Sequence, residues 1–208
     1  MPDFLGGIDY TWPFYAAAVC GYLLGSIPFG LVLTKLAGMG DIRAIGSGNI
    51  GATNVLRTGN KKLAAATLLL DGAKGAVAVL IAQTWGQDMA VMAAGGAMLG
   101  HCFPIWLKFK GGKGVATFLG IMLAIVWPAG IACCLTWLAV AALFRFSSLA
   151  ALIAVIAAPL YAWYFADFQI MYLAGLMALL VVFRHHENIG RLFAGTEPRI
   201  GRKKEASA

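Results

Sequence analysis

Charged side chains are scarce in this sequence. Only 12% of the 208 residues are Asp, Glu, Lys or Arg, whereas 61% are hydrophobic. A chain this poor in charge belongs to the membrane class, and its length suits one compact domain without a separate soluble one. The net charge is +7. Because the cations stand between apolar runs, we expect membrane lipids or phosphorylated substrates as partners, and no nucleic acid.

Cysteine is also rare, and its spacing does not match the common metal and redox motifs. No two cysteines form a Cys-x-x-Cys pair, and no set of His, Cys and carboxylates has metal-ligand spacing. We therefore expect neither a metal nor another cofactor. The four cysteines lie in apolar runs and are interpreted as small buried apolar residues: Cys20, Cys102, Cys133 and Cys134.

The N-terminus has no basic residues. Residues 1–12 carry Asp3 and Asp9 but no Lys or Arg, so they lack the cationic start of a cleaved signal peptide. We therefore interpret the first apolar run as a retained membrane span.

Long apolar runs, by contrast, are abundant and predict membrane-spanning helices. A helix needs about 20 residues to cross about 30 Å of hydrocarbon, because each residue adds about 1.5 Å. The run 114–144 would form one helix about 46 Å long, but Pro128 near its middle removes a helix donor and divides it. The charge-free runs are 10–34, 75–87, 89–107, 114–144, 146–166 and 168–183, the second reaching span length only from Leu63.

These runs predict an all-α fold, a polytopic membrane helix bundle of seven transmembrane helices over residues 1–198, with a polar cytoplasmic tail at 199–208. If the N-terminus is outside, the inner segments carry 15 of the 16 Lys and Arg, and the outer segments carry only acidic charges. This asymmetry follows the positive-inside rule and predicts a cytoplasmic C-terminus. A six-span arrangement would put Arg145 and the basic tail across the membrane from the first two basic loops. The inner segments are 35–62, 108–114, 144–147 and 184–208.

Glycines and short polar side chains gather in the first inner loop. Gly46, Gly48 and Gly51 are spaced closely enough for their amides to form an anion nest. The same glycines match a dinucleotide fingerprint without its βαβ unit, and a Walker loop with Ala52 in place of the lysine, so a nucleotide site is not expected. We favour phosphate binding over a merely flexible, solvated loop. The polar residues beside the glycines are Ser47, Asn49, Thr53, Asn54 and Arg57, the last offering a bidentate fork.

The second inner loop places three lysines around a double glycine. Lys110, Gly111, Gly112 and Lys113 suit an anionic group. Charge anchoring with contact to lipid headgroups explains the loop equally well.

The third inner segment, 184–191, follows the last span directly. His185 can act as an acid or a base near neutral pH. Asn188 comes three residues later, so a continued helix puts both on one face.

In the remaining inner turn, Ser147 or Ser148 is interpreted as a helix cap rather than a site residue. Within the second span, Asp71 and Lys74 can pair on one helix face, either as part of a site or to hold the bundle together.

Together these segments resemble the bacterial acyl-phosphate-dependent glycerol-3-phosphate acyltransferases, an integral-membrane family. The resemblance covers about residues 22–191, and includes Gly100–His101 besides the loops above. It implies seven spans in the bacterial inner membrane, with the active site at the cytoplasmic face. It also implies transfer of a fatty acyl group from acyl phosphate to the 1-hydroxyl of glycerol 3-phosphate, giving lysophosphatidic acid and phosphate for phospholipid biosynthesis.

Positions that match the family's motifs, with the loop residues beside them, give the candidate site. Predicted catalytic residues are Ser47, Arg57, Lys113, His185 and Asn188. Predicted substrate-binding residues are Gly46, Gly48, Asn49, Thr53, Asn54, Lys110, Gly111, Gly112 and Ser148.

This chemistry suits the residues. Both substrates carry phosphate, so two anion sites are needed side by side, and acyl phosphate is already activated, so no covalent enzyme intermediate is required. Lys113 and Arg57 can neutralise the departing phosphate. His185 or the substrate's own phosphate takes the hydroxyl proton. A monomer is expected.

The alternative to an enzyme is a transporter of a phosphorylated metabolite or lipid. A transporter, however, predicts polar groups along a path through the bilayer rather than on one face.

Overall fold

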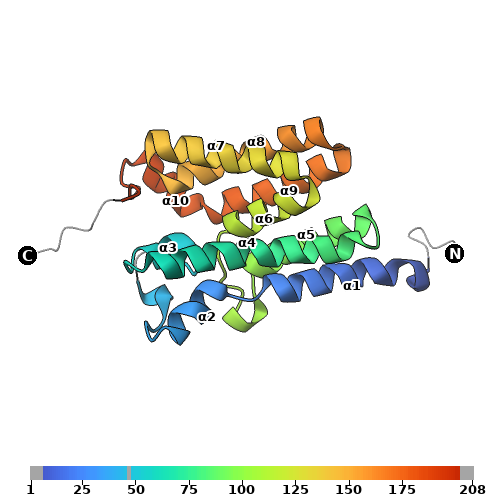
Figure 1. The fold of residues 1–208 in the computed structure, drawn as a ribbon, viewed down its shortest axis with the longest axis horizontal. Helices are drawn as coiled ribbons and strands as arrows, with labels where there is room; N and C mark the ends of the chain where they lie inside the picture. Colours follow the sequence, from blue (N-terminus) through green and yellow to red (C-terminus); the bar gives the residue numbers. More distant parts are fainter. Residues whose placement is uncertain (1–6, 46–47, 202–208) are drawn as a thin grey trace, which may run out of the picture.

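The computed structural model describes residues 7–45 and 48–201. Within these ranges the chain forms helices and loops and no strand, which confirms the all-α prediction (Figure 1). The helices are α1 (Ile8–Gly25), α2 (Phe29–Leu36), α3 (Ala52–Leu56), α4 (Lys61–Gln83), α5 (Gln87–Cys102), α6 (Val115–Ile125), α7 (Trp127–Phe144), α8 (Ser147–Phe165), α9 (Phe168–Arg184) and α10 (His186–Phe193), with short 3-10 turns η1 (Ile42–Ala44) and η2 (Ile105–Leu107).

Several of these helices are long and apolar enough to cross a membrane. In the described part of the chain there are five such segments, or six if α9 and α10 form one span bent by 62°. Helix α6 is also apolar but has only 11 residues. The five segments are Ile8–Leu36, Lys61–Gln83, Gln87–Leu107, Trp127–Phe144 and Ser147–Phe165.

The predicted division of the longest apolar run is confirmed. Helix α6 ends at Ile125 and α7 begins at Trp127, with Pro128 in the first turn of α7. Proline is accepted there because its missing N–H has no partner within the helix. The corner between the two helices is tight, since a Cβ on Gly130 would lie 2.5 Å from the backbone of Leu123. Helix α6 is short because the second inner loop extends to Gly114, the residue before the helix, which has a φ of +86°.

Close glycine contacts join α1 to α5. A Cβ on Gly21 would lie 2.3 Å from the backbone O of Ala93, and one on Gly25 would lie 2.1 Å from that of Ala97. Residue numbers rise together on the two helices, so they run parallel. Small residues four apart let membrane helices approach closely, where packing replaces the hydrophobic driving force. Two glycines of α5 make the reciprocal contacts, Gly96 with Ala18 and Gly100 with Tyr22.

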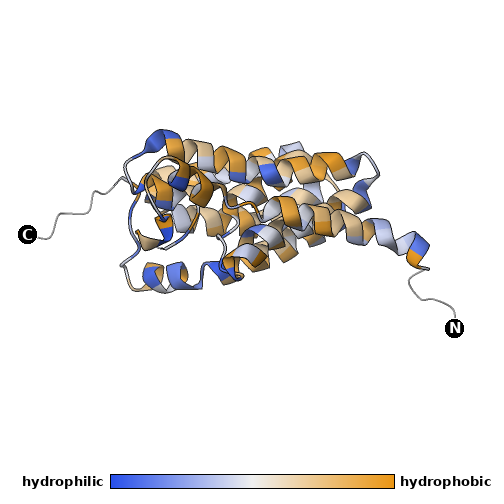
Figure 2. Ribbon diagram, turned by 90° about the horizontal axis from the view of Figure 1, so that it is seen from below, coloured by the Kyte–Doolittle hydropathy of each residue, from blue (hydrophilic) through white to orange (hydrophobic). Residues whose placement is uncertain are grey.

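The bundle consists of two helix groups joined by the short helix. Helices α1, α4 and α5 pack together, α7, α8 and α9 pack together, and α6 contacts both α4 and α7 (Figure 1). Fully buried Phe118 and Met122 of α6 fill the space between the groups. Hydrophilic residues gather mainly toward the ends of the bundle, while the helix shafts are mostly hydrophobic (Figure 2).

The burial of the cysteines tests their interpretation as small buried residues. Cys102 and Cys133 are buried as expected, but Cys20 is exposed on α1, so its interpretation as a buried residue was wrong.

The predicted tail at 199–208 lies partly outside the described residues. Within its described part, Arg199 stacks over the ring of Phe146 at 5.4 Å, and Ile200 N donates to the backbone O of Arg145 at 2.7 Å.

Candidate active site

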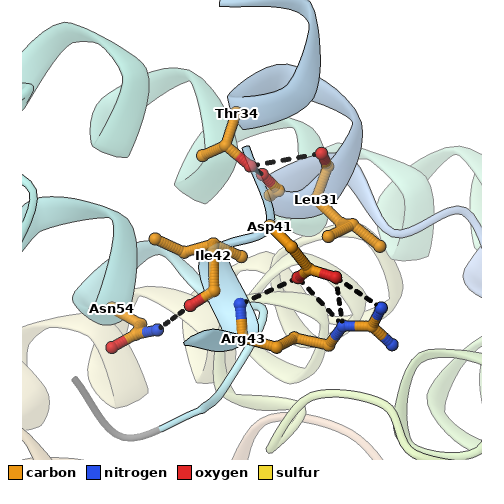
Figure 3. Close-up of polar contacts among 7 residues, drawn as sticks. Leu31, Thr34, Asp41, Ile42, Arg43 and Asn54 are labelled. Atoms are coloured by element: carbon orange, nitrogen blue, oxygen red, sulfur yellow. Dashed lines mark hydrogen bonds and ion pairs between the residues drawn. The ribbon is translucent and has the colours of Figure 1, made fainter. Parts of the chain in front are cut away.

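The first inner loop is held together by its own polar side chains (Figure 3). Asp41 accepts hydrogen bonds from the backbone N of Arg43 at 2.9 Å and from the guanidinium of Arg43 at 2.6 Å. These contacts lower the pKa of Asp41 to about 2, the hydrogen bond from the Arg43 side chain contributing most. Arg43 is thereby engaged within the loop.

Buried Asn54 ties the two ends of this loop together. Its Nδ2 donates toward the backbone oxygens of Ile42, Ile45 and Asn49 at 3.0, 2.9 and 2.8 Å. The Asn49 side chain in turn accepts from the backbone N of Gly51 at 3.2 Å. Two of the predicted binders, Asn49 and Asn54, therefore shape the loop. Gly48 lies at its bend with a φ of +69°, while Gly46 and Ser47 lie outside the described residues.

Two exposed polar residues of the first segment, Thr53 and Arg57, lie within α3 and at its end. Thr53 Oγ1 lies 3.5 Å from Ser147 Oγ, which brings α3 to the start of α8. Arg57 is the exposed C-cap residue of α3. The alternative in which a serine caps α8 was wrong: the cap residue is Phe146, and no side chain makes a capping hydrogen bond there.

The second inner loop is anchored to the end of α5 through its glycines. The backbone N of Gly111 donates to Cys102 O at 3.1 Å, and that of Gly112 donates to His101 O at 3.0 Å. From the other side, Arg184 donates to the backbone oxygens of both glycines at 2.9 and 3.1 Å. These two amides therefore point toward α5 and are not part of an open anion nest. Lys110 of the same loop is exposed.

Lys113 of this loop connects it with the third segment. Its ammonium donates a hydrogen bond to the Oδ1 of buried Asn188 on α10. Burial lowers the pKa of Lys113, and the nearby charges of Arg191 and Arg57 lower it further, against an opposing effect of Glu197. The second loop, α10 and the α3 arginine are thus close enough for their charges to interact.

A carboxylate that the sequence analysis missed completes the cluster. Glu197 Oε1 accepts hydrogen bonds from Asn188 Nδ2 at 2.6 Å and from buried Ser148 Oγ at 2.7 Å. Its Oε2 pairs with Arg191 Nε at 2.7 Å, and the Glu197 side chain is only 6% exposed. The sequence gives no signal that singles it out, since Glu187 and Glu205 lie in the same basic stretch.

The two histidines of the third segment have different surroundings. His185 is 3% exposed, and its Nδ1 lies 2.7 Å from the backbone O of Val181. Because a carbonyl only accepts, Nδ1 must carry the hydrogen, which leaves Nε2 as the nitrogen with a lone pair. His186 is exposed. The expected continuous helix through His185 and Asn188 was wrong, since the chain bends by 62° between α9 and α10.

The three inner segments therefore meet at the start of α8, at the end of the bundle that carries α3, α10 and the C-terminal segment (Figure 1). Cations and neutral donors surround the Glu197 carboxylate there, so the donor groups are of the kind that hold an anion. In the part of the chain that the structure describes, no three His, Cys, Asp or Glu residues are placed to hold a metal ion.

Sequence comparisons identify relatives that span nearly the whole chain. A family model described as glycerol-3-phosphate acyltransferase matches residues 15–195. A glycerol-3-phosphate acyltransferase of Cereibacter sphaeroides is 58% identical over 98% of this chain and 100% of its own length. One from Paramagnetospirillum magneticum is 61% identical over 93% of this chain and 96% of its own length.

The fold is also similar to solved structures. Two crystal structures are of PlsY (YgiH), an integral membrane glycerol 3-phosphate acyltransferase, in its glycerol 3-phosphate and lysophosphatidic acid forms. The first is 38% identical and covers 90% of this chain and 96% of its own, with a TM-score of 0.86; the second is 37% identical, covers 90% and 95%, and has a TM-score of 0.84. From the family match and these relatives, this chain belongs to the glycerol-3-phosphate acyltransferase family.

Proposed function

We propose that this protein transfers a fatty acyl group from acyl phosphate to the 1-hydroxyl of glycerol 3-phosphate, giving 1-acylglycerol 3-phosphate and inorganic phosphate. The observation that carries the proposal is the meeting of Lys113, Asn188 and Ser148, with Arg57 nearby, at one polar cluster in a membrane protein. Family membership favours this enzyme over the transporter considered from the sequence.

The proposed reaction is a direct displacement. The 1-hydroxyl oxygen attacks the acyl carbonyl carbon, the new ester C–O bond forms, and the bond from that carbon to the phosphate oxygen breaks. Lys113 and Arg57 balance the charge of the departing phosphate, so the developing anion is stabilised without a covalent enzyme intermediate. The hydroxyl proton has two candidate acceptors, Nε2 of His185 and an oxygen of the substrate's phosphate.

An apolar groove supports an acyl chain as part of the substrate. It lies between α8 and α9, has a volume of about 470 Å³, and includes Pro159, Gly175 and Val182 in its lining. Val182 comes three residues before His185, so the groove begins at the end of α9 that carries the site. We propose that the acyl chain of acyl phosphate occupies this groove while its phosphate lies among the cations.

The proposed topology has seven spans, with α6 as a short seventh, the N-terminus outside and the C-terminus in the cytoplasm. The parallel course of α1 and α5 supports it, because both then run from outside to inside. The location of the cations supports an active site at the cytoplasmic face of the inner membrane. We keep residues 1–198 as the membrane domain of a monomer.

Phosphate release tests the function. Purified protein in detergent or nanodiscs is given palmitoyl phosphate and glycerol 3-phosphate, and both phosphate and lysophosphatidic acid are measured. We expect the two products in equal amounts, and none when palmitoyl-coenzyme A replaces palmitoyl phosphate. Well-folded protein that releases no phosphate would refute the enzyme. Uptake of glycerol 3-phosphate into proteoliposomes without acylation would favour the transporter instead.

A further inference from the structure

Three polar side chains are buried where α1, α4 and α5 meet, apart from the cluster around Glu197. Asp71 and Lys74 of α4 are 2% and 3% exposed, and His101 of α5 is 4% exposed. Lys74 Nζ donates to Asp71 Oδ1 at 2.8 Å, which confirms the predicted pair, and to the backbone O of Ile27 at 2.7 Å. Ile27 lies at the break between α1 and α2, so the ion pair is fixed to a neighbouring element.

His101 lies between this ion pair and the second inner loop. Its Nδ1 is 3.8 Å from Asp71 Oδ1, and among the described residues it is the buried side-chain polar atom that has no hydrogen-bond partner. The other end of the ring faces the loop: a Cβ on Gly112 would lie 2.1 Å from His101 Nε2. The imidazole thus fills the space that any side chain at position 112 would need.

The loop that His101 supports carries the lysine of the site. Gly112 is bonded on one side to the backbone O of His101 and on the other to Arg184. Lys113 follows immediately, and its ammonium reaches Asn188. A shift of Gly112 would therefore move the point from which the lysine extends, and misplacing a group by about 1 Å costs an enzyme up to about 10²-fold in rate.

We propose that His101 is a positioning residue, whose imidazole sets the place of Gly112 and through it the reach of Lys113. The buried Asp71–Lys74 pair backs the ring on the side away from the loop. This inference rests on the proposed function, in which Lys113 holds a substrate phosphate. His101 itself does not touch substrate and acts through the loop.

Two substitutions of His101 test the contribution of each end of the imidazole ring separately. Glutamine has a polar group near the place of Nε2, and asparagine has one near the place of Nδ1 but leaves the space beneath Gly112 empty. We expect His101→Gln to keep both Michaelis constants near wild type. His101→Asn should raise KM for glycerol 3-phosphate or palmitoyl phosphate about tenfold or more. Unchanged KM values in His101→Asn, with only the active fraction reduced, would overturn the proposal.

A reciprocal test uses the glycines of the loop. Gly112→Ala should lose most activity because its Cβ meets the ring, and adding His101→Asn should recover several-fold because the ring tip is gone. Gly111→Ala is the matched control, since its Cβ would lie 2.2 Å from the backbone O of His101, which no substitution at 101 removes. Recovery of both alanine variants, or of neither, would contradict the contact.

The failure of this inference and of the proposed function can be told apart. If the wild type does not turn over, the proposed function fails, and the melting temperatures of the same variants still test the contact. We expect Gly112→Ala to lower the melting temperature less in the His101→Asn background than in the wild type. Strictly additive changes would mean that the ring and Gly112 do not interact.

Discussion

The side-chain amide of Asn188 donates a hydrogen bond to Glu197 Oε1 at 2.6 Å, while its oxygen accepts one from Lys113. A single amide thereby links the lysine of the second loop to a carboxylate that follows α10. The amide cannot be turned over without placing its NH₂ group against the ammonium and its oxygen against the carboxylate. This relationship fixes the orientation of Asn188 and makes Glu197 the counter-charge of the cluster.

Glu197 should make the stability of the protein sensitive to acid. Burial raises its pKa, but hydrogen bonds from Ser148, Asn188 and Arg191 outweigh burial and bring the pKa below the ordinary 4.5. A carboxyl with a lowered folded pKa adds stability above its unfolded pKa and loses it as the pH falls through the folded value. We expect the melting temperature to drop below about pH 4.5, and Glu197→Gln to weaken that drop and cost about 1 kcal/mol or more at neutral pH.

The control for this experiment is Glu187→Gln. The Glu187 side chain is 65% exposed and lies 3.8 Å from Arg191, so its loss should change little. An acid profile that is identical in Glu197→Gln and the wild type would show that this carboxylate is not bound as described.

Lys113→Ala and Arg57→Ala should each lower kcat/KM by about 10²-fold or more, which is the scale for removing one donor to a developing anion. Neither change should unfold the protein, because Arg57 is exposed and Lys113 is not fully buried. Phosphate release and thermal unfolding are measured in parallel. Exposed Lys62 of α4 provides the matched control, Lys62→Ala, and rates equal to wild type in the first two variants would remove both cations from the site.

The buried ion pair of α4 should be sensitive to the loss of either partner. Lys74→Ala leaves the Asp71 carboxylate without its counter-charge, and such a change costs about 3–5 kcal/mol. Replacing both partners, as in Asp71→Asn with Lys74→Met, removes both charges and should be much less harmful. Thermal unfolding in detergent measures the difference. A double variant as unstable as Lys74→Ala would mean that the pairing is not what matters.

Filling the groove between α8 and α9 should change the preference for acyl-chain length. A Cβ on Gly175 would lie 4.0 Å from Pro159 Cγ, so Gly175→Leu has room for its first atom but projects into the groove. We expect KM for palmitoyl phosphate to rise about tenfold, the scale of a lost fit in an apolar pocket, and that for octanoyl phosphate to stay the same. Gly95→Leu on α5, where nothing lies within 4 Å, is the control. Equal effects on both chain lengths would place the acyl chain elsewhere.

The features that the sequence predicted well depend on composition and on single strong signals. Charge-free runs give helices because the backbone must satisfy its own hydrogen bonds in lipid, and Pro128 divides the longest run because it lacks a donor. The pairing of Asp71 with Lys74 follows from their spacing on one helix. The three cationic segments also meet, as expected if they share one face of the membrane.

The features that were missed depend on tertiary contacts. The lysines around Gly111 and Gly112 indicated an anionic ligand, but the bonding of these two amides to carbonyls at the end of α5 is a tertiary contact that a sequence pattern cannot place. Asn54 stays a predicted substrate-binding residue, and its burial and its hydrogen bonds to three loop carbonyls became visible only in the folded loop. Glu197 was missed because a glutamate in a basic stretch has no defined partner until α8 and α10 come together.

The place of Glu197 in the chain has a consequence for biogenesis. This carboxylate follows all the helices in the described part of the protein, and the nascent polypeptide emerges in the same order. Until Glu197 is made, the positive charges of Lys113 and Arg191 lack this counter-charge, so we expect the second loop and α10 to pack tightly only once the last segment has docked. Translation therefore completes the membrane scaffold before it completes the charge balance of the site.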